Sequence, residues 1–461
     1  MKVLLFGTGY FYRAYHHWFK DEDIVALLDN DAAKQGQVLD GHRVVAPADG
    51  VKLDYEAVFI LSMYERDMRE QLLTLGVPRN RIFGVFDIGR FVQGNGENAR
   101  VQKFPAVRRN DTGKVRIAIL SADLRRNGAS VAAVYAAQAL REQYDVTVIT
   151  PTDGPLRQTL TEAGIEVWMA PVLQVAKQAD VPWLQEFRLL FCNTFIWYAF
   201  LSRRDVRQPV IWWLHDAACF YDMVDNSVLR QIDLHNLYIM SVGPQPGEAL
   251  RRFLPQAEEK DLLYGLPDAC PQVYQPQIGE QVRFATVGMV QSHKGQDLLL
   301  DAIACMPAHW RQRAEFYLVG DTDSALAKEL HVRLIDFPEV QMTGEMSRED
   351  LLHFYEQIDV LVCPSRADSM PIVATEAMMF SHPCIISDQV GTGKYLHQGE
   401  DGIIYPVQDV EALAEAMVNF IAQPQLIATM GSRARKVYER IFAWPIFEHN
   451  IRQCVTEALN D

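Results

Sequence analysis

The sequence predicts an α/β protein made of a small N-terminal Rossmann-like domain followed by two Rossmann-like lobes. Short apolar runs recur along the 461 residues, as buried parallel strands require, and segments with helical spacing separate them. Two segments rich in turn-forming residues, 93–98 and 267–281, interrupt this alternation and mark a linker and a hinge. Regular alternation of strand and helix favours parallel sheets covered by helices on both faces.

The first expected domain comprises residues 1–98 with its linker. Its apolar runs predict strands at Val3–Phe6, Ile24–Leu28 and Ala57–Leu61, and helical spacing predicts a helix at Glu65–Leu75. The linker Gln93–Asn98 carries two glycines and two asparagines, so the domain is expected to have a core separate from the rest of the chain.

The second and third expected domains are the two lobes, residues 114–270 and 271–461. For the second, the apolar runs predict strands at Val115–Leu120, Val146–Thr150, Val167–Ala170 and Val210–Leu214. For the third, they predict strands at Arg283–Val287, Phe316–Val319, Val360–Cys363 and Cys384–Ser387, with helices at Gln296–Ile303, Arg348–Ile358 and Glu411–Ile421. The last helix is a candidate to pack back on the second domain.

The composition limits the classes of function. With 49% hydrophobic and 22% charged residues, the chain has the composition of a typical globular protein and can bury a large core. A net charge of −15 argues against a general nucleic-acid-binding protein, because neutralising phosphates requires a concentrated basic surface. The seven cysteines are scattered without a C-x-x-C pair, which predicts reduced, mostly buried thiols rather than disulfides or structural zinc.

The location of the protein is expected to be cytoplasmic. The first residues run directly into a glycine turn and lack the apolar core of a signal peptide. The most aromatic segment, Phe191–Leu201, is too short to span a bilayer. Arg203, Arg204 and Arg207 follow it, and this basic cluster keeps open a peripheral association with the inner face of the membrane, beside the alternative of an ordinary solvated loop.

The segment Pro364–Pro383 is the most informative part of the sequence. It sets Asp368 and Glu376 eight positions apart across the junction between a buried strand and a helix that Pro371 can open. A helix start favours a phosphate, and an acid two turns further along can reach a ribose. The junction therefore suits a nucleotide-diphosphate sugar, although a helix cap at Asp368 and a solvated acid at Glu376 are the simpler alternatives.

These residues resemble the Glu-x7-Glu motif of the retaining, family-four GT-B glycosyltransferases, in the Asp-x7-Glu form. The resemblance covers about 114–461, and further motifs occur in the order of the family. They are Asn127-Gly-Ala-Ser130, Trp212-Trp-Leu-His-Asp216, Gly265-Leu-Pro-Asp268 and Val287-Gly-Met-Val-Gln-Ser-His-Lys-Gly-Gln296. The resemblance implies two lobes in the GT-B arrangement and the transfer of a sugar, typically a hexose, with retention of configuration.

The resemblance also implies roles for individual residues. Catalytic roles fall to His215, near the transferred sugar, and to Asp368, on the sugar hydroxyls. The implied donor-binding residues are Gly128, His293, Lys294, Met370, Ile372, Val373 and Glu376. Among them, Lys294 neutralises the diphosphate, the amides near Met370, Ile372 and Val373 bind phosphate, and Glu376 holds the ribose. Many relatives carry an arginine where this chain has Met289, so half of the usual cationic pair is missing, with His293 or Lys394 as substitutes.

The expected partners are a nucleotide-diphosphate sugar and a glycan, lipid-linked or protein acceptor, as in the biosynthesis of cell-envelope polysaccharides, with a homo-oligomer left open. No cofactor or metal is expected, because Lys294 and the helix start supply positive potential for the leaving diphosphate. The triplets Asp29-Asn-Asp31 and Asp321-Thr-Asp323 raise the alternative of a metal-dependent transferase. Turn-forming or helix-capping acids explain both triplets more simply.

Three other functions remain as alternatives. A GT-B-fold epimerase would convert the sugar nucleotide without an acceptor, and a catalytically silent subunit would bind it without turnover. The third alternative is an oxidoreductase that uses Gly7-Thr-Gly9 and Asp29, which follows Gly7 by 22 positions. Tyr12 stands where a dinucleotide-binding loop has its third glycine, and its bulk opposes close packing of helix on strand.

Overall fold

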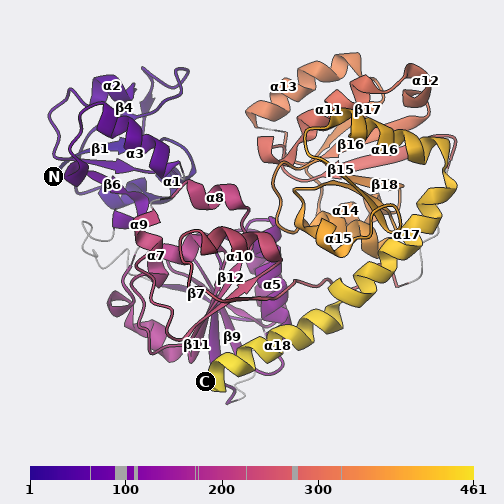
Figure 1. Cartoon of the computed structure of the whole chain (residues 1–461). Coiled ribbons are helices and arrows are strands. Elements are labelled where there is room, and N and C mark those ends of the chain that lie inside the picture. The colour runs from indigo at the N-terminus through magenta and orange to yellow at the C-terminus, as the bar shows by residue number, and fades with distance from the viewer. Residues whose placement is uncertain are drawn as a thin grey trace.

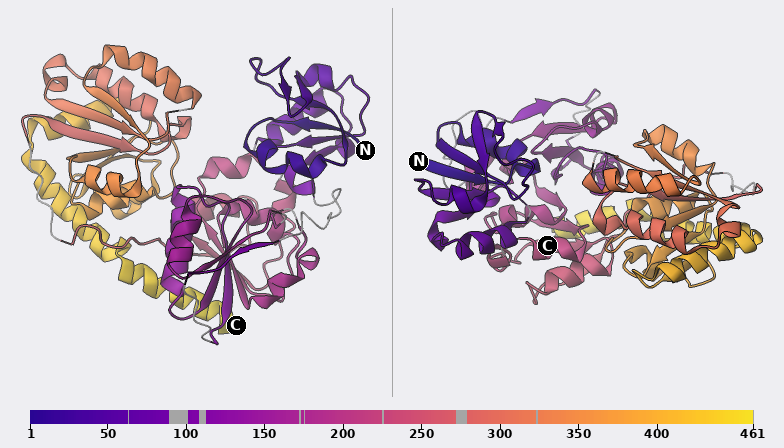
Figure 2. Two further views of the ribbon diagram at one scale, coloured as in Figure 1. Left: turned by 180° about the vertical axis from the view of Figure 1, so that it is seen from behind. Right: turned by 90° about the horizontal axis from the view of Figure 1, so that it is seen from above.

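A computed structural model of the chain describes residues 1–62, 64–88, 101–107, 113–171, 173–174, 176–224, 226–271, 279–322 and 324–460. Three α/β units follow one another along the chain (Figure 1). The first and third units lie at opposite ends, and the second lies between them (Figure 2). The predicted α/β fold class is confirmed. The linker 93–98 and most of the predicted hinge, 272–278, lie outside the described residues.

The first sheet has the strand order β3-β4-β2-β1-β5-β6 and is parallel except for the pair of β3 with β4. Its strands are β1 (Lys2–Phe6), β2 (Asp23–Leu28), β3 (Val38–Leu39), β4 (His42–Val45), β5 (Ala57–Ile60) and β6 (Ile82–Gly84). The α-helices are α1 (Tyr10–Tyr15), α2 (Pro47–Gly50) and α3 (Glu65–Thr74). All three predicted strands and the predicted helix are present, and the short β3, β4 and β6 are additions.

The second sheet has the order β14-β13-β12-β11-β8-β9-β10-β7, with only the edge strand β7 antiparallel to its neighbour. Its strands are β7 (Gln102–Phe104), β8 (Arg116–Leu120), β9 (Asp145–Thr150), β10 (Glu166–Met169), β11 (Leu189–Asn193), β12 (Val210–Leu214), β13 (Leu237–Ser241) and β14 (Glu259–Asp261). Its α-helices are α5 (Gly128–Leu140), α6 (Leu156–Glu162), α7 (Tyr198–Leu201), α8 (Ala218–Asp222), α9 (Asn226–Leu229) and α10 (Pro244–Arg251). The strand order reverses between β8 and β11.

The third sheet is entirely parallel, with the order β17-β16-β15-β18-β19-β20. Its strands are β15 (Val282–Val287), β16 (Ala314–Val319), β17 (Val340–Gly344), β18 (Val360–Cys363), β19 (Cys384–Ser387) and β20 (Gly402–Tyr405). Its α-helices are α11 (Gln296–Cys305), α12 (Ala308–Arg311), α13 (Ala325–Arg333), α14 (Arg348–Tyr355), α15 (Ile372–Met379) and α16 (Val410–Ala422), followed by α17 (Gln425–Val437) and α18 (Trp444–Asn460). The strand order reverses between β15 and β18, and parallel α/β sheets bind their ligands at such a reversal.

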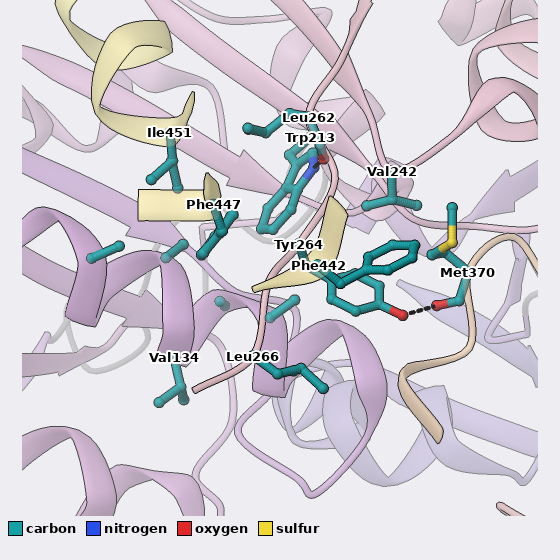
Figure 3. Close-up of a cluster of buried hydrophobic side chains, with 14 of the residues drawn as sticks. Val134, Trp213, Val242, Leu262, Tyr264, Leu266, Met370, Phe442, Phe447 and Ile451 are labelled. Atoms are coloured by element: carbon teal, nitrogen blue, oxygen red, sulfur yellow. Dashed lines mark hydrogen bonds between the residues drawn. The ribbon is translucent and has the colours of Figure 1, made fainter. Parts of the chain in front are cut away.

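The end of the chain joins the two lobes. Helix α18 runs from the third unit along the second (Figure 1), and Arg452 Nε donates to the carbonyl of Ala139 at 2.9 Å. The ring of Phe447 stacks on Trp213 at a centroid distance of 5.9 Å, and the hydroxyl of Tyr264 donates to the carbonyl of Met370 at 3.1 Å (Figure 3). One buried hydrophobic cluster therefore contains residues of both lobes.

The first unit has a core of its own on one face of its sheet, which includes Leu4, Leu28 and Leu72, but the other face shares a core with the second unit. A single buried cluster includes aromatic residues of α1 and the following turn, such as Phe11 and Trp18, together with residues of the second unit such as Tyr198. The N–H of Arg66 also donates to the carbonyl of Met223 at 3.1 Å. Aromatic side chains that the sequence places in the first unit thus cover the second, so removal of residues 1–98 would expose apolar surface.

The basic cluster after α7 is mostly occupied in internal contacts. Arg204 is buried and donates to the carbonyls of Asp233 and His235, and Arg207 pairs with Asp205 at 2.7 Å. Within the described part of the chain, no helix combines the length and apolar content needed to cross a bilayer. All seven cysteines are free thiols, as predicted, but only three of them are buried.

Candidate active site

The loops that follow β15 and β18 cross at the carboxyl edge of the third sheet. Gly295 has a φ of +71°, and a Cβ at this position would lie 2.0 Å from the carbonyl oxygen of Pro364. Only glycine combines this left-handed backbone with so close an approach. The crossing of the loops brings the side chain of Lys294, one residue earlier, over the segment after β18.

Lys294 and Asp368 form an ion pair at this crossing. The Nζ and Oδ2 atoms are 2.6 Å apart, and the side chains are 25% and 12% exposed. Burial lowers the pKa of Lys294, but the charge of Asp368 and the hydrogen bond to it outweigh this effect and raise the pKa above its usual value. The lysine is therefore charged, and the simpler alternative of a helix-capping Asp368 is wrong, because Asp368 pairs with Lys294 and no side chain caps α15.

Helix α15 begins beside this pair. No side chain caps its start after Pro371, so the N–H groups of its first turn, which begins with Ile372 and Val373, are available to an anion. Met370 precedes the helix and is buried, with its carbonyl bound by Tyr264. The structure thus brings the predicted phosphate-binding residues next to the predicted diphosphate lysine.

Glu376 is deep in the protein rather than solvated. It is 2% exposed, and its carboxylate accepts hydrogen bonds from Arg348 of α14 and from the hydroxyl of Tyr355, the latter at 2.9 Å. Burial raises the pKa of Tyr135 of α5, on the other lobe, and the nearby charge of Arg348 opposes this rise. The simpler alternative of a solvated helix acid is therefore wrong, and Arg348 is a site residue that the sequence analysis missed.

His293 and Met289 occupy the loop after β15. Burial, and then the charge of Lys294, lower the pKa of His293, so its ring is neutral near pH 7. The ring of His293 meets Phe220 of α8 edge to face at 6.0 Å, which is a contact between the two lobes. Met289 is exposed. Lys394 lies beyond β19, in a short 3₁₀ turn at Gly391–Tyr395.

The opposing edge of the second sheet carries Gly128 and His215. Gly128 opens α5, where Asn127 Oδ1 accepts a hydrogen bond from the N–H of Ser130 at 2.9 Å. A Cβ on Gly128 would lie 3.8 Å from Ile372 Cδ1, so α5 and α15 face each other across the lobes. His215 follows β12, and burial lowers its pKa to about 3, which keeps the imidazole neutral.

Asp216 is a second residue that the sequence analysis missed. Burial raises the pKa of this carboxyl to about 6, even though its Oδ2 accepts a hydrogen bond from the N–H of Phe195 at 2.7 Å. An acid with a perturbed pKa that directly follows a strand of a parallel sheet is a candidate functional group. Its place directly after His215 was visible in the sequence, but nothing in the sequence indicated its burial.

We expect Asp216→Asn to stabilise the protein at neutral pH. The folded protein binds the proton of this carboxyl more tightly than the unfolded chain, so ionisation of Asp216 costs stability as the pH rises from about 4 to about 6. The neutral amide removes this cost, by at most about 3 kcal/mol. Thermal melts should show a higher Tm at pH 7.5 and no gain near pH 3.5. An equal gain at both pH values would contradict the assignment.

The acids of the first unit have local partners. Asp29 accepts hydrogen bonds from the N–H and hydroxyl of Thr8, and Lys34 pairs with it at 3.2 Å. Its other oxygen accepts from the N–H of Asp31 at 2.9 Å, so this triplet forms a turn, as the simpler alternative predicts. Tyr12 is buried in the shared core. Among the described residues there is no group of three or more metal-ligating acids, histidines or cysteines; Asp323 lies outside them.

Comparison with known proteins matches two parts of the chain to families. Residues 281–423 match the family of glycosyl transferases group 1, and residues 1–83 match the family "C2185-like, N-terminal". A D-inositol 3-phosphate glycosyltransferase of Streptomyces griseus is 29% identical over 231 residues, which cover 47% of this chain and 48% of that protein. An uncharacterised glycosyltransferase of Methanocaldococcus jannaschii is 27% identical over 38% of this chain and 48% of its own length. The chain therefore spans about half the length of these curated relatives.

Solved structures extend the likeness of fold over both lobes. HepE of Anabaena in complex with UDP-glucose covers 74% of this chain and 99% of its own length, with a TM-score of 0.63 and 19% identity. A sucrose-phosphate synthase of Thermosynechococcus elongatus covers 75% of this chain and 99% of its own, with a TM-score of 0.63 and 18% identity. Residues 281–423 thus match the group 1 glycosyl transferases, and they lie within a two-lobed fold like that of the GT-B glycosyltransferases.

Proposed function

We propose that the protein transfers a sugar, typically a hexose, from a nucleotide-diphosphate sugar to an acceptor, with retention of configuration. The observation that carries this proposal is the carboxyl edge of the third sheet, where Lys294, Asp368 and the uncapped start of α15 meet. A cation beside free helix N–H groups suits a diphosphate. The complex of HepE with UDP-glucose supports a nucleotide sugar as the partner.

The proposed reaction assigns each group a task. Lys294 and the N–H groups of Ile372 and Val373 hold the diphosphate, Asp368 holds sugar hydroxyls, and Glu376 holds the ribose. The bond between the anomeric carbon and the phosphate oxygen breaks as the acceptor oxygen bonds to that carbon. The departing phosphate takes the proton of the acceptor hydroxyl, so no protein nucleophile is required.

Two groups must change partners when the donor binds. Lys294 is neutralised by Asp368, and Glu376 is covered by Arg348 and Tyr355. A diphosphate competes with Asp368 for the ammonium and frees that carboxylate for sugar hydroxyls. Donor binding in this proposal therefore replaces contacts within the protein by contacts with the nucleotide sugar.

The cellular setting belongs to the same proposal. We propose a cytoplasmic enzyme, associated peripherally with the membrane where its acceptor is lipid-linked, that serves polysaccharide or cell-envelope biosynthesis. A glycan or a protein is the other kind of acceptor that fits. The curated relatives named above are glycosyltransferases, and this does not favour an epimerase or a silent binding subunit.

A panel of donors tests the proposed function. Wild-type protein is incubated with UDP-, GDP-, ADP- and dTDP-sugars, and release of nucleotide and sugar is followed with binding measured by calorimetry. We expect at least one donor to bind and to be hydrolysed slowly without acceptor, with the anomeric configuration retained. An interconverted, intact sugar nucleotide would instead identify an epimerase, and binding without any turnover would identify a silent subunit.

We expect donor hydrolysis and transfer to persist in excess EDTA. Lys294 and the start of α15 supply the positive potential that a divalent cation would otherwise bring to the leaving diphosphate. Rates measured with and without an excess of chelator should agree within about twofold. Activity that EDTA abolishes and magnesium or manganese restores would contradict this prediction.

A further inference from the structure

The second sheet has its own switch point, between β8 and β11, and two polar atoms beside it are buried without a partner. They are Oδ1 of Asn193, at the end of β11, and Nε2 of His215, just after β12; neither has a hydrogen-bond partner among the described residues. Asn193 is fully buried. Buried polar atoms are nearly always hydrogen-bonded, so each of these calls for a ligand or an ordered water.

The two residues lie on the same face of the sheet. Asn193 pairs in register with Trp213, and His215 follows Trp213 by two positions, so all three side chains project to one side. The rings of Trp213 and His215 are 4.2 Å apart. Asn193 Nδ2 donates to the carbonyl of Ala129, in the first turn of α5, at 2.9 Å. Both residues therefore sit beside the end of α5 that faces the donor lobe.

That hydrogen bond also fixes the orientation of the Asn193 amide. A carbonyl only accepts, so the atom facing Ala129 is the nitrogen and the unpartnered atom is the oxygen. The backbone supports the arrangement: Thr194 has a φ of +86°, which is strained for a β-branched residue, and its own Oγ1 is buried without a partner in the described structure. Strain of this kind concentrates at functional sites.

We propose that Asn193 Oδ1 and His215 Nε2 form the subsite for a hydroxyl group of a neutral, carbohydrate acceptor. This inference rests on the proposed transfer reaction and adds the acceptor class to it. A hydroxyl donates one hydrogen bond and accepts others, so it can donate to the amide oxygen and interact with the neutral imidazole at once. Neither side chain is charged, so the pair offers no counter-charge to a phosphate.

The acceptor enters this subsite opposite the donor. Gly128, which opens α5, faces Ile372 at the start of α15, and Gly243 after β13 faces Met370, where a Cβ would lie 3.0 Å from its Cε. Both unpartnered atoms are covered by neighbouring protein in this structure. The proposed subsite therefore requires the two edges to move apart, so that the acceptor hydroxyl lies between the second sheet and the donor residues.

Kinetics of Asn193→Ala and Asn193→Ser test this subsite. The serine variant retains a donor for the carbonyl of Ala129 and guards against loss of folding in the alanine variant. The matched control is Thr147→Val, which removes a fully buried, unpartnered hydroxyl on β9. The acceptor probes are methyl α-glucoside, methyl α-galactoside and methyl α-mannoside, with D-inositol 3-phosphate as an anionic probe and the best donor of the panel.

The expected result is a selective loss toward the acceptor. Both Asn193 variants should raise the acceptor KM by at least about tenfold, while donor affinity and acceptor-free hydrolysis stay within about twofold of wild type and of Thr147→Val. An unchanged acceptor KM, as expected if only water fills the site, would overturn the proposal. Wild-type transfer to D-inositol 3-phosphate alone, or to no probe despite donor hydrolysis, would overturn the carbohydrate class. Failure of the wild type to bind any donor would instead refute the proposed function.

Discussion

Replacing Lys294 with alanine is expected to lower the rate of sugar transfer by at least about a hundredfold. The ammonium lies 2.6 Å from Asp368, next to the uncapped start of α15, and Met289 leaves no arginine in the same loop to share its task. Charge accumulates on the diphosphate as the glycosidic bond breaks, so a cation held there stabilises the transition state more than the ground state. Acceptor-free hydrolysis and transfer should fall together in steady-state assays.

Stability measurements separate this loss from unfolding. The ion pair is partly exposed, so breaking it should cost less than the roughly 3–5 kcal/mol typical of a fully buried pair. Lys294→Arg should keep part of the activity, and Lys328→Ala, which removes an exposed lysine of α13, should keep all of it. A Lys294→Ala variant that melts normally and transfers sugar at the wild-type rate would show that the pair serves only to join two loops.

Hydrophobic periodicity was sufficient to predict most of the strands around the site. The run at Val360–Cys363 and the proline at 371 predict the strand, the junction and the helix start that the structure contains. Strand β11 was missed because only Asn193 and Thr194 separate its apolar residues from the aromatic segment Phe195–Leu201, so the two were taken as one stretch. A left-handed backbone at Thr194 ends the strand, and a composition rich in aromatic residues does not reveal that turn.

The burial of individual side chains and the pairing of residues far apart in the chain could not be predicted from the sequence. Glu376, eight positions after Asp368, was correctly placed on a helix, but its contact with Arg348 joins segments 28 positions apart. The raised pKa of Asp216 arises from the packing of whole elements around it. The shared core of the first two units is likewise invisible to local patterns, because aromatic residues at helical spacing look the same whether they cover their own sheet or a neighbouring unit.

The second large effect is expected at Glu376, where glutamine should weaken binding of the donor nucleotide by about tenfold or more. A carboxylate accepts two strong hydrogen bonds from vicinal ribose hydroxyls, whereas the amide offers one weaker acceptor and a donor that faces the wrong way. Alanine is a poor test of this role, because Glu376 is 2% exposed. Removing its carboxylate would leave the hydroxyl of Tyr355 and the guanidinium of Arg348 without their acceptor, which would destabilise the fold. Calorimetric titration with the nucleotide measures the loss.

Glutamine should preserve the fold well enough for that titration to be decisive. Its carbonyl oxygen can still accept from Tyr355, and Arg348 is 42% exposed, so its charge remains solvated when its partner becomes neutral. The control is Glu349→Gln, an exposed acid next to Arg348 on α14, which should bind nucleotide as the wild type does. If Glu376→Gln also binds nucleotide with wild-type affinity while melting at a lower temperature, then Glu376 is a structural partner of Arg348 and Tyr355, and the ribose must be held elsewhere along the same sheet edge.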